Sequence, residues 1–291
     1  MSDMEKNKIE GGVLYLVGVP IGNLADISER AKKVLGEVDF VAAEDTRNSM
    51  KLLSAYGIRR ELISYHEHNR RASGERIIAR LLGGESCALV TDAGMPAISD
   101  PGEDIVRECA EAGIVVSVIP GACAAVSALA VSGLPTSRFA FEGFIPPVKG
   151  ERAKRLEAVR YEDRTMIFYE APHKLKATLA DMCEVFGGDR RIALCRELTK
   201  LNEEIIRTTL SGAVEYYGTH EPRGEYVLVV GGFDGERPSA GGADAVLLSP
   251  TEQVEKYIGE GMAKMDAIKR AAKERGMSKS ELYKIIVDGE K

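Results

Sequence analysis

The segment SCALVTDAGMPAISDPGEDIVRECAEAGIVVSVIPGACAAVSALAVSG at residues 86–133 decides the fold. It opens with a short apolar run that is typical of a buried strand and continues into a loop rich in glycine and proline. Asp100-Pro101-Gly102-Glu103 then has the pattern of a helix start, with Asp100 as the expected N-cap. A second β-branched run, IVVSVIP, follows Gly113. Strand, helix and strand in this order predict parallel strands joined by a crossover helix.

The same alternation continues on both sides of this segment. Upstream, GVLYLVG (12–18) and DFVAAE (39–44) are strand-like and are separated by an amphipathic helical pattern. Downstream, helical patterns occur at 149–162 and 172–186, between strand-like runs that are close enough in sequence to form a mixed sheet. Those runs are 139–144, 165–170, 191–198, 203–210 and 225–232.

These patterns predict an α/β protein with two subdomains and a small all-helical domain. We expect a flexible N-terminus at 1–11, then α/β subdomains at 12–136 and 137–232. The Gly-rich polar stretch at 233–249 is typical of a linker. Residues 250–291 have only helical patterns and resemble a helix-turn-helix, with a capping box from Ser278 to Glu281.

Composition excludes some classes of protein. With 291 residues, 44% hydrophobic and 29% charged, the chain is long and apolar enough to bury a core. Its net charge of −6 argues against a protein that coats nucleic acid through bulk charge.

Residues 112–137 carry no charge, but Pro120-Gly121 interrupts them, so we expect a strand, a turn and a small-residue helix rather than a membrane span. Five cysteines without a C-x-x-C motif favour buried thiols in the cytoplasm.

Three loops rich in glycine and proline follow predicted strands, at 17–23, 91–102 and 119–128. Ligands of α/β sheets bind at such strand ends, and these residue types allow close approach of the backbone. Tight turns without a ligand are the alternative for any one loop. The usual phosphate-binding and dinucleotide motifs are missing from the sequence. His66 and His68 in YHEHN have too few neighbouring ligands to predict a metal site.

Six blocks occur in a diagnostic order: VPIGNLADISERA, VAAEDTRNSMKLL, LVTDAGMPAISDPG, VIPGACAAVSALAVSGLPTSRFAFEGFIP, RTMIFYEAPHKL and CRELTKLNEE. Together they resemble the ribosomal RNA small subunit methyltransferase I family, within the tetrapyrrole methylase superfamily. The resemblance covers roughly residues 12–232. It implies two α/β halves with S-adenosylmethionine bound in the cleft between them, and a homodimer.

The resemblance also implies a reaction and a partner. Members of the family methylate the 2′-hydroxyl of a cytidine in the decoding region of 16S ribosomal RNA, within the small ribosomal subunit. A tetrapyrrole or small-molecule methyltransferase is the alternative from the same superfamily. A non-catalytic nucleic-acid-binding regulator is a third reading, which leaves the three cofactor-type loops unexplained.

The cofactor positions that the resemblance implies act largely through the backbone or apolar contact. Met95 and Cys123 replace Thr, Asp or Ser of many relatives, so a polar contact is not expected there. The full set is Pro20, Ala93, Gly94, Met95, Ile98, Cys123, Ala124, Tyr169, Glu170, Leu198 and Thr199.

A base is needed because a ribose hydroxyl is a poor nucleophile until its proton leaves. Asp45, at the end of the second strand, is the leading candidate, and an N-cap role for the following helix is its alternative. Glu170 is the second catalytic candidate, with cofactor contact as its alternative. We expect Glu44 to organise the loop.

Basic residues are the expected phosphate contacts of an RNA substrate, and a solvated helix face is the alternative for each. The main candidates are Arg47, Lys149, Arg152, Lys154, Arg155 and Lys200, with Arg59, Arg60, Arg70 and Arg71 as further ones. The C-terminal segment from Lys264 to Lys284 holds seven basic and three acidic residues, a local excess of +4. It is expected either to dock on RNA or ribosomal protein or to cap the main body.

Overall fold

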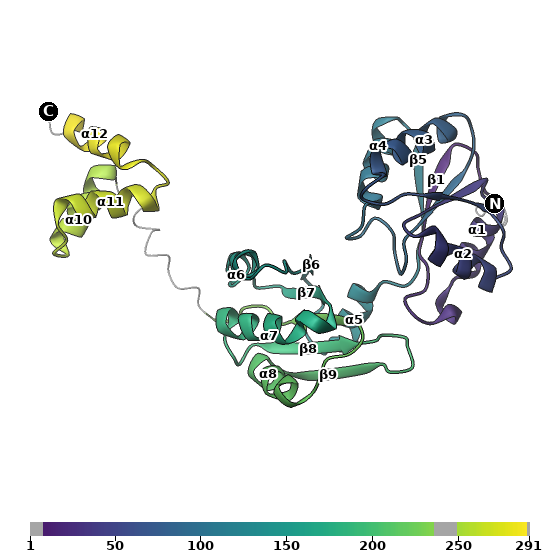
Figure 1. Cartoon of the computed structure of the whole chain (residues 1–291). Coiled ribbons are helices and arrows are strands. Elements are labelled where there is room, and N and C mark those ends of the chain that lie inside the picture. Colours follow the sequence, from purple (N-terminus) through teal and green to yellow (C-terminus); the bar gives the residue numbers. More distant parts are fainter. Residues whose placement is uncertain (1–7, 236–248, 290–291) are drawn as a thin grey trace. The chain divides into compact units, whose positions relative to one another are not determined.

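The computed structural model describes residues 8–235 and 249–289, and the contacts within the chain form two compact units, Met1–Phe233 and Asp234–Lys291. Figure 1 shows the elements in chain order. Most of the expected linker at 233–249, and most of the expected N-terminal segment at 1–11, lies outside the described residues.

The first sheet of the larger unit is entirely parallel, with strand order β3-β2-β4-β1-β5. Its strands are β1 (Val13–Val17), β2 (Phe40–Ala43), β3 (Glu61–Ser64), β4 (Cys87–Val90) and β5 (Val115–Ile119). β2 and β4 are buried along their whole length, as expected for strands covered on both faces. The parallel alternation predicted from residues 86–133 is confirmed.

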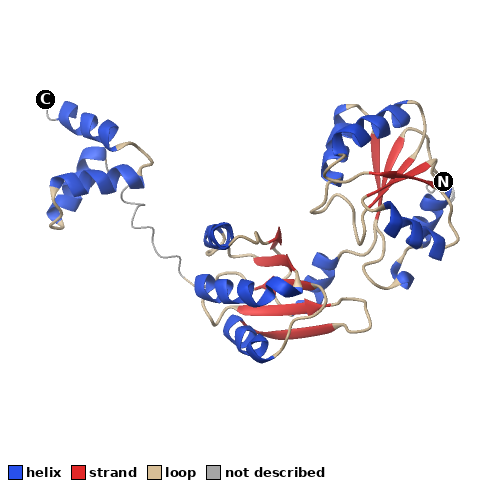
Figure 2. Ribbon diagram, in the orientation of Figure 1, coloured by secondary structure: helices blue, strands red, loops and turns tan. Residues whose placement is uncertain are grey.

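Helices cover both faces of this sheet (Figure 2). α1 (Glu29–Glu37) and α2 (Thr46–Ala55) pack against one face through a cluster that includes Val34, Leu35 and Leu53. α3 (Arg70–Leu82) and α4 (Gly102–Glu111) pack against the other through Ile77 and Ile105. Consecutive residues of β1 belong to opposite clusters, because side chains alternate across a strand.

The start of α4 differs from the expected one. The N-cap position is Pro101, and the helix begins at Gly102. The carboxylate of Asp100 still accepts hydrogen bonds from the backbone N–H of Gly102 (2.7 Å) and of Ala97 (3.0 Å). It therefore closes the preceding loop onto the helix start instead of occupying the cap position.

The uncharged segment at 112–137 forms β5, a turn and α5 (Ala124–Ser132), as predicted. α5 ends at Gly133, whose φ of 73° is the left-handed conformation that favours glycine at a helix C-terminus. Among the described residues, no helix has the length and apolar character that crossing a membrane requires.

The second sheet is mixed, with strand order β6-β7-β10-β8-β9. Its strands are β6 (Phe139–Phe144), β7 (Thr165–Glu170), β8 (Arg191–Arg196), β9 (Glu204–Thr209) and β10 (Tyr226–Val230). Only β6 and β7 pair in parallel. This confirms the mixed sheet expected from the spacing of these strands.

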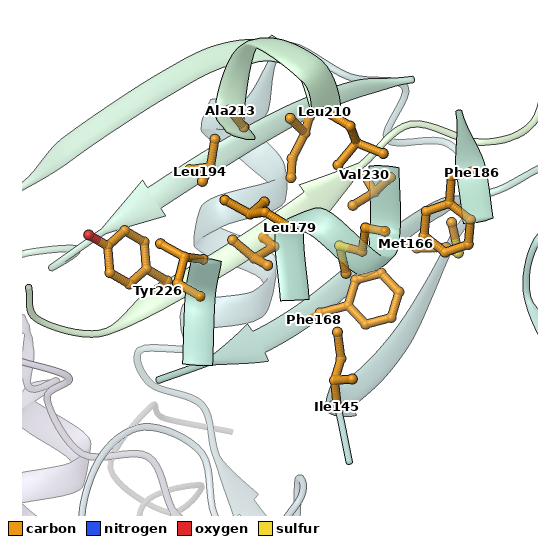
Figure 3. Close-up of a cluster of buried hydrophobic side chains, with 14 of the residues drawn as sticks. Ile145, Met166, Phe168, Leu179, Phe186, Leu194, Leu210, Ala213, Tyr226 and Val230 are labelled. Carbon is orange, nitrogen blue, oxygen red and sulfur yellow. The ribbon is translucent and has the colours of Figure 1, made fainter. Parts of the chain in front are cut away.

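The core of the second sheet lies beneath three helices, α6 (Lys149–Ala158), α7 (Pro172–Phe186) and α8 (Leu210–Thr219). Figure 3 shows how Phe168 and Met166 of β7 pack with Leu179 and Phe186 of α7. α5 covers the opposite face through Ala128 and neighbouring small residues. Because α5 follows the third glycine-rich loop, this packing joins that loop to the second sheet.

The smaller unit is a three-helix domain of α10 (Pro250–Gly259), α11 (Lys264–Glu274) and α12 (Lys279–Gly289). Val254, Tyr257, Ile268, Leu282 and Ile286 form its core. The predicted capping box before α12 is present, since Ser278 and Glu281 each accept a hydrogen bond from the other's backbone N–H. The predicted fold class, two α/β parts and a helical C-terminal part, is confirmed.

Candidate active site

The three glycine-rich loops meet at the carboxyl ends of β1, β4 and β5. Val19 and Gly94 exchange two backbone hydrogen bonds, of 3.0 and 3.1 Å, which fasten the first loop to the second. The N–H of Gly18 donates to the carbonyl of Ile119 at 3.0 Å, at the entrance to the third loop. Backbone contacts therefore fix the mutual positions of all three loops.

A cavity of about 510 Å³ is lined by these loops and by the ends of β7, β8 and β10. This volume lies in the range typical of small-molecule sites. Nine of the eleven residues predicted for the cofactor line it. They are Ala93, Gly94, Met95, Ile98, Cys123, Ala124, Tyr169, Glu170 and Leu198.

The other two predicted cofactor residues, Pro20 and Thr199, are not among the lining residues. Pro20 is buried within the first loop. Thr199 adopts a left-handed φ of 67°, and its N–H donates to the carboxylate of Glu203 at 2.6 Å. Its hydroxyl is buried, and none of the described residues forms a hydrogen bond with it. Thr199 thus shapes the turn behind the cavity.

The cavity also holds charged residues to which the sequence analysis assigned no cofactor role. They are Glu44, Asp92, Asp100, Glu197, Lys200 and Glu225. Asp92 was within reach of prediction, because it follows a buried strand directly in the LVTDAG block. Glu197 and Ser99 have left-handed φ values of 50° and 63°, so backbone strain is concentrated at the cavity wall.

Asp45 is the N-cap of α2, which confirms the alternative considered for it. Its carboxylate accepts from the backbone N–H of Arg47 (2.8 Å) and from both Nε (3.1 Å) and Nη2 (2.7 Å) of the Arg47 guanidinium. These hydrogen bonds lower the pKa of Asp45 to about 2. Asp45 does not line the cavity. A carboxylate held in this way is a weak base, so the structure does not favour Asp45 as the proton acceptor.

Glu170 is 3% exposed, and both of its carboxylate oxygens are occupied. One accepts from the N–H of Ala171 (2.8 Å) and the other from the hydroxyl of Thr178 (2.5 Å). Glu170 thereby fixes the start of α7 at the cavity wall, and its burial favours a positioning role over a catalytic one, whereas Asp92 on the same cavity is exposed. Glu44 accepts from the hydroxyl of Thr91 at 2.9 Å, in agreement with its expected part in organising the loop.

The expected RNA contacts separate into different groups. Arg152 is 7% exposed, and its guanidinium donates to Asp181 (2.6 Å) and to the carbonyl of Pro147 (3.1 Å). The expectation that Arg152 contacts RNA is therefore wrong, because the side chain is used to join α6 to α7. Lys149 and Lys154 on the same helix are exposed, and neither has an ion-pair partner among the described residues.

Three other expected RNA contacts are already paired. Arg47 pairs with Asp45, and Arg155 pairs with Glu142. Lys200 lies at the cavity and contacts Glu197 (2.9 Å) and Glu225 (2.7 Å). Arg47 is 83% exposed, so its pair with Asp45 is weak and can exchange for a phosphate, whereas the carboxylates of Glu142 and Glu197 are only 8% and 18% exposed. His66 and His68 lie with their rings 5.9 Å apart, and the described part of the chain gathers no set of three or more residues able to hold a metal ion.

Solved structures share this fold. A uroporphyrin-III-C-methyltransferase from Thermus thermophilus matches with a TM-score of 0.54 at 23% identity, covering 76% of this chain and 94% of that one. A diphthine synthase matches with a TM-score of 0.57 at 15% identity, covering 75% and 90%. The family model described as Tetrapyrrole (Corrin/Porphyrin) Methylases matches residues 13–214. The chain belongs to this family of methyltransferases.

Sequence relatives narrow the assignment within the family. The chain is 48% identical to Ribosomal RNA small subunit methyltransferase I of Halalkalibacterium halodurans, over 94% of both chains. It is 47% identical to the protein of the same name from Bacillus subtilis, over 95% of this chain and 94% of that one. The chain is thus a member of the ribosomal RNA small subunit methyltransferase I group, whose methyl donor is S-adenosylmethionine.

The cavity fits this donor by its size and by the chemistry of its wall. The donor carries a cationic sulfonium and an ammonium group beside a flat adenine. Ile98, Leu198 and Val227 give the wall apolar surface, while Asp92 and Asp100 place anionic oxygens on it. The second loop, at Ala93 and Gly94, adds backbone groups. Apolar walls with a few polar anchors are typical of small-molecule sites.

Proposed function

We propose that this protein transfers the methyl group of S-adenosylmethionine to the 2′-hydroxyl of a cytidine in the decoding region of 16S ribosomal RNA. The observation that carries this proposal is the cavity, because the three glycine-rich loops that line it lie within residues 13–214, the part of the chain that the family model matches. The match with this chain covers 94% of the length of each of the two relatives, and the name that these relatives carry supports an RNA substrate of the small ribosomal subunit.

The bound donor supplies an activated methyl group, so this chain has to position the acceptor and take up a proton. A rigid cavity holds the reacting atoms in line and excludes water, which can account for much of the rate. The hydroxyl proton passes to a carboxylate. We assign this part to Asp92, which lines the cavity directly after β4, and give Asp45 the part of holding Arg47 at the surface.

RNA is held, in this proposal, by cations of both units. On the larger unit these are Lys149, Lys154 and Arg155 of α6, together with Arg47 and with Lys200, which lines the cavity. The helical unit adds exposed basic side chains, which are Lys269, Lys273, Lys279 and Lys284. Each phosphate contact makes RNA affinity fall more steeply with salt concentration. Because these residues are few, we expect only a modest slope of log affinity against log salt concentration.

The test uses S-adenosylmethionine labelled in the methyl group, with unmodified small ribosomal subunits, free 16S ribosomal RNA and a uroporphyrinogen in separate reactions. We expect label in the RNA, and after nuclease digestion we expect it on the ribose of a cytidine. Label on a base would contradict the 2′-O assignment. Label only in the tetrapyrrole would establish the small-molecule alternative.

The same proposal includes a homodimer that acts in the cytoplasm, where ribosomal subunits are assembled. β5 is an edge strand of its sheet, and its Val115 and Val118 are 62% and 52% exposed. An exposed edge strand with apolar side chains favours association with a second chain. Sedimentation of the wild type as a dimer and of Val118→Glu as a monomer would support it. A monomeric wild type would contradict it.

A further inference from the structure

A second hollow, of about 300 Å³, adjoins the donor cavity. The two hollows share Thr91 and Asp92, the residues directly after β4. The shared residues place whatever the second hollow binds next to the methyl donor.

One face of α2 forms a wall of this hollow. Lys51 and Leu52 lie three and four residues after Asn48, and Ala55 lies seven after it, so these side chains share one side of the helix. Leu24, in the short 3₁₀ helix η2 (Leu24–Asp26), forms another wall. The hydroxyl of Tyr56 donates to the carbonyl of Leu24 at 2.7 Å, which ties this wall to the end of α2.

Hydrogen bonds fix the orientation of the Asn48 amide. Its Nδ2 donates to Oδ2 of Asp92 at 3.0 Å, and the other Asp92 oxygen accepts from the backbone N–H of Asp45 at 3.3 Å. A carboxylate can only accept, so the amide must turn its NH₂ group toward Asp92. The Asn48 oxygen is left as a hydrogen-bond acceptor beside the hollow.

Lys51 supplies the charge that a nucleotide requires. Its side chain is exposed, and none of the described residues forms an ion pair with it. Leu24 and Leu52 supply apolar surface on the same hollow. An acceptor, a free cation and two apolar side chains together match a nucleoside with its phosphate, because flipped bases are held by their edge and by apolar contact.

We propose that this hollow binds the target cytidine and that Asn48 selects cytosine. This proposal rests on the proposed function. The Asn48 oxygen accepts from the exocyclic amine of cytosine, Lys51 contacts the neighbouring phosphate, and Leu24 and Leu52 pack against the base. Uracil carries an oxygen in place of that amine, and two facing acceptors repel each other. The hollow thus excludes uridine while Asp92 lies toward the ribose.

The experiment compares the wild type with Asn48→Ala and Lys51→Met, using small subunits reconstituted with C or U at the methylated position. Ser54→Ala is the matched control, because Ser54 is exposed on α2 and does not line the hollow. We expect Asn48→Ala to reduce the preference for C over U by about three- to tenfold, the effect of one hydrogen bond. We expect Lys51→Met to raise KM for the small subunit. The slope of log KM against log salt concentration should become shallower by about one, because one phosphate contact is lost.

Donor affinity gives a readout that does not depend on RNA. Titration calorimetry with S-adenosylmethionine should give the same Kd for the wild type and for both variants. An unchanged preference for C over U in Asn48→Ala, with ribosomal RNA still labelled, would overturn this proposal and leave the proposed function standing. A weakened donor Kd would assign the hollow to the donor and would also overturn it. If the wild type labels no ribosomal RNA, the proposed function fails first.

Discussion

Gly18 of the first glycine-rich loop and Gly121 of the third are in backbone contact. A Cβ placed on Gly121 would lie 2.7 Å from both the carbonyl carbon and the carbonyl oxygen of Gly18. One placed on Gly18 would lie 2.6 Å from both Cα and N of Gly121. These distances are too short for any side chain, so the first and third loops can approach this closely only with glycine at both positions.

Gly121→Ala should therefore separate the two loops. We expect it to reduce the free energy of unfolding by about 1–3 kcal/mol, as overpacking does, and to weaken donor binding. Gly36→Ala in α1 is the control, because nothing lies within 4 Å of its added Cβ. In a helix this control should be neutral or stabilise by up to about 1 kcal/mol. Calorimetry with S-adenosylmethionine and urea unfolding measure both effects. Normal donor affinity in Gly121→Ala would show that the contact does not shape the cavity.

The fold was predictable where hydrophobic patterns are long and repeated. β3 was missed, because ELIS is a four-residue edge strand with one fully buried side chain. So short a pattern does not distinguish a strand from a loop. The start of α4 was placed at the wrong residue because Asp100 closes a loop there, a tertiary detail that the capping pattern does not contain.

The site was predictable where backbone loops form it and less so where single side chains decide its chemistry. Arg152 lies in a basic stretch, yet it is buried against Asp181, a partner 29 residues away. Asp45 and Asp92 each follow a strand of the same sheet, and the sequence does not say which of them faces the cavity. The structure separates these carboxylates, because Asp45 accepts hydrogen bonds from Arg47 at the start of α2 while Asp92 lies on the cavity wall.

Asparagine substitutions distinguish these two carboxylates. Asp45→Asn keeps an N-cap of equal quality, so we expect its stability to match the wild type and its kcat to fall less than tenfold, roughly the loss of one surface pair. Asp92→Asn removes the proposed proton acceptor, and general-base catalysis contributes about 10²–10⁴-fold. Single-turnover methylation at saturating donor measures the difference. The reverse order, with Asp45→Asn the slower enzyme, would return the base assignment to Asp45.

Arg152 and Lys154 lie on the same helix, but we expect alanine at Arg152 to lower stability and alanine at Lys154 to weaken RNA binding instead. The side chains of Arg152 and Asp181 are 8% and 15% exposed, and removing one partner of a buried pair costs about 3–5 kcal/mol. Arg152→Ala should therefore lose stability in urea unfolding. Lys154→Ala should leave stability within about 0.5 kcal/mol, as surface changes do, and should weaken RNA binding with a shallower salt dependence. Equal stability of the two variants would contradict the interior position of Arg152.

Glu162 should make stability depend on pH in the acid range. Its carboxylate accepts from Nε (2.7 Å) and Nη2 (2.8 Å) of Arg164, and these hydrogen bonds lower its pKa from 4.5 to about 2. Between these two values the unfolded chain binds more protons than the folded one, so this contribution to stability is complete above pH 4.5 and is lost as the pH falls through about 2.

We therefore expect Glu162→Gln to be less stable than the wild type at pH 7, with a difference that shrinks as the pH is lowered. Urea midpoints measured from pH 7 to pH 2 follow this convergence. Glu215→Gln, an exposed change on α8, is the control for the loss of a surface carboxylate, and its urea midpoints are measured over the same pH range. A Glu162→Gln difference that stays constant across this range would mean that the pair with Arg164 does not lower the pKa of Glu162 in solution.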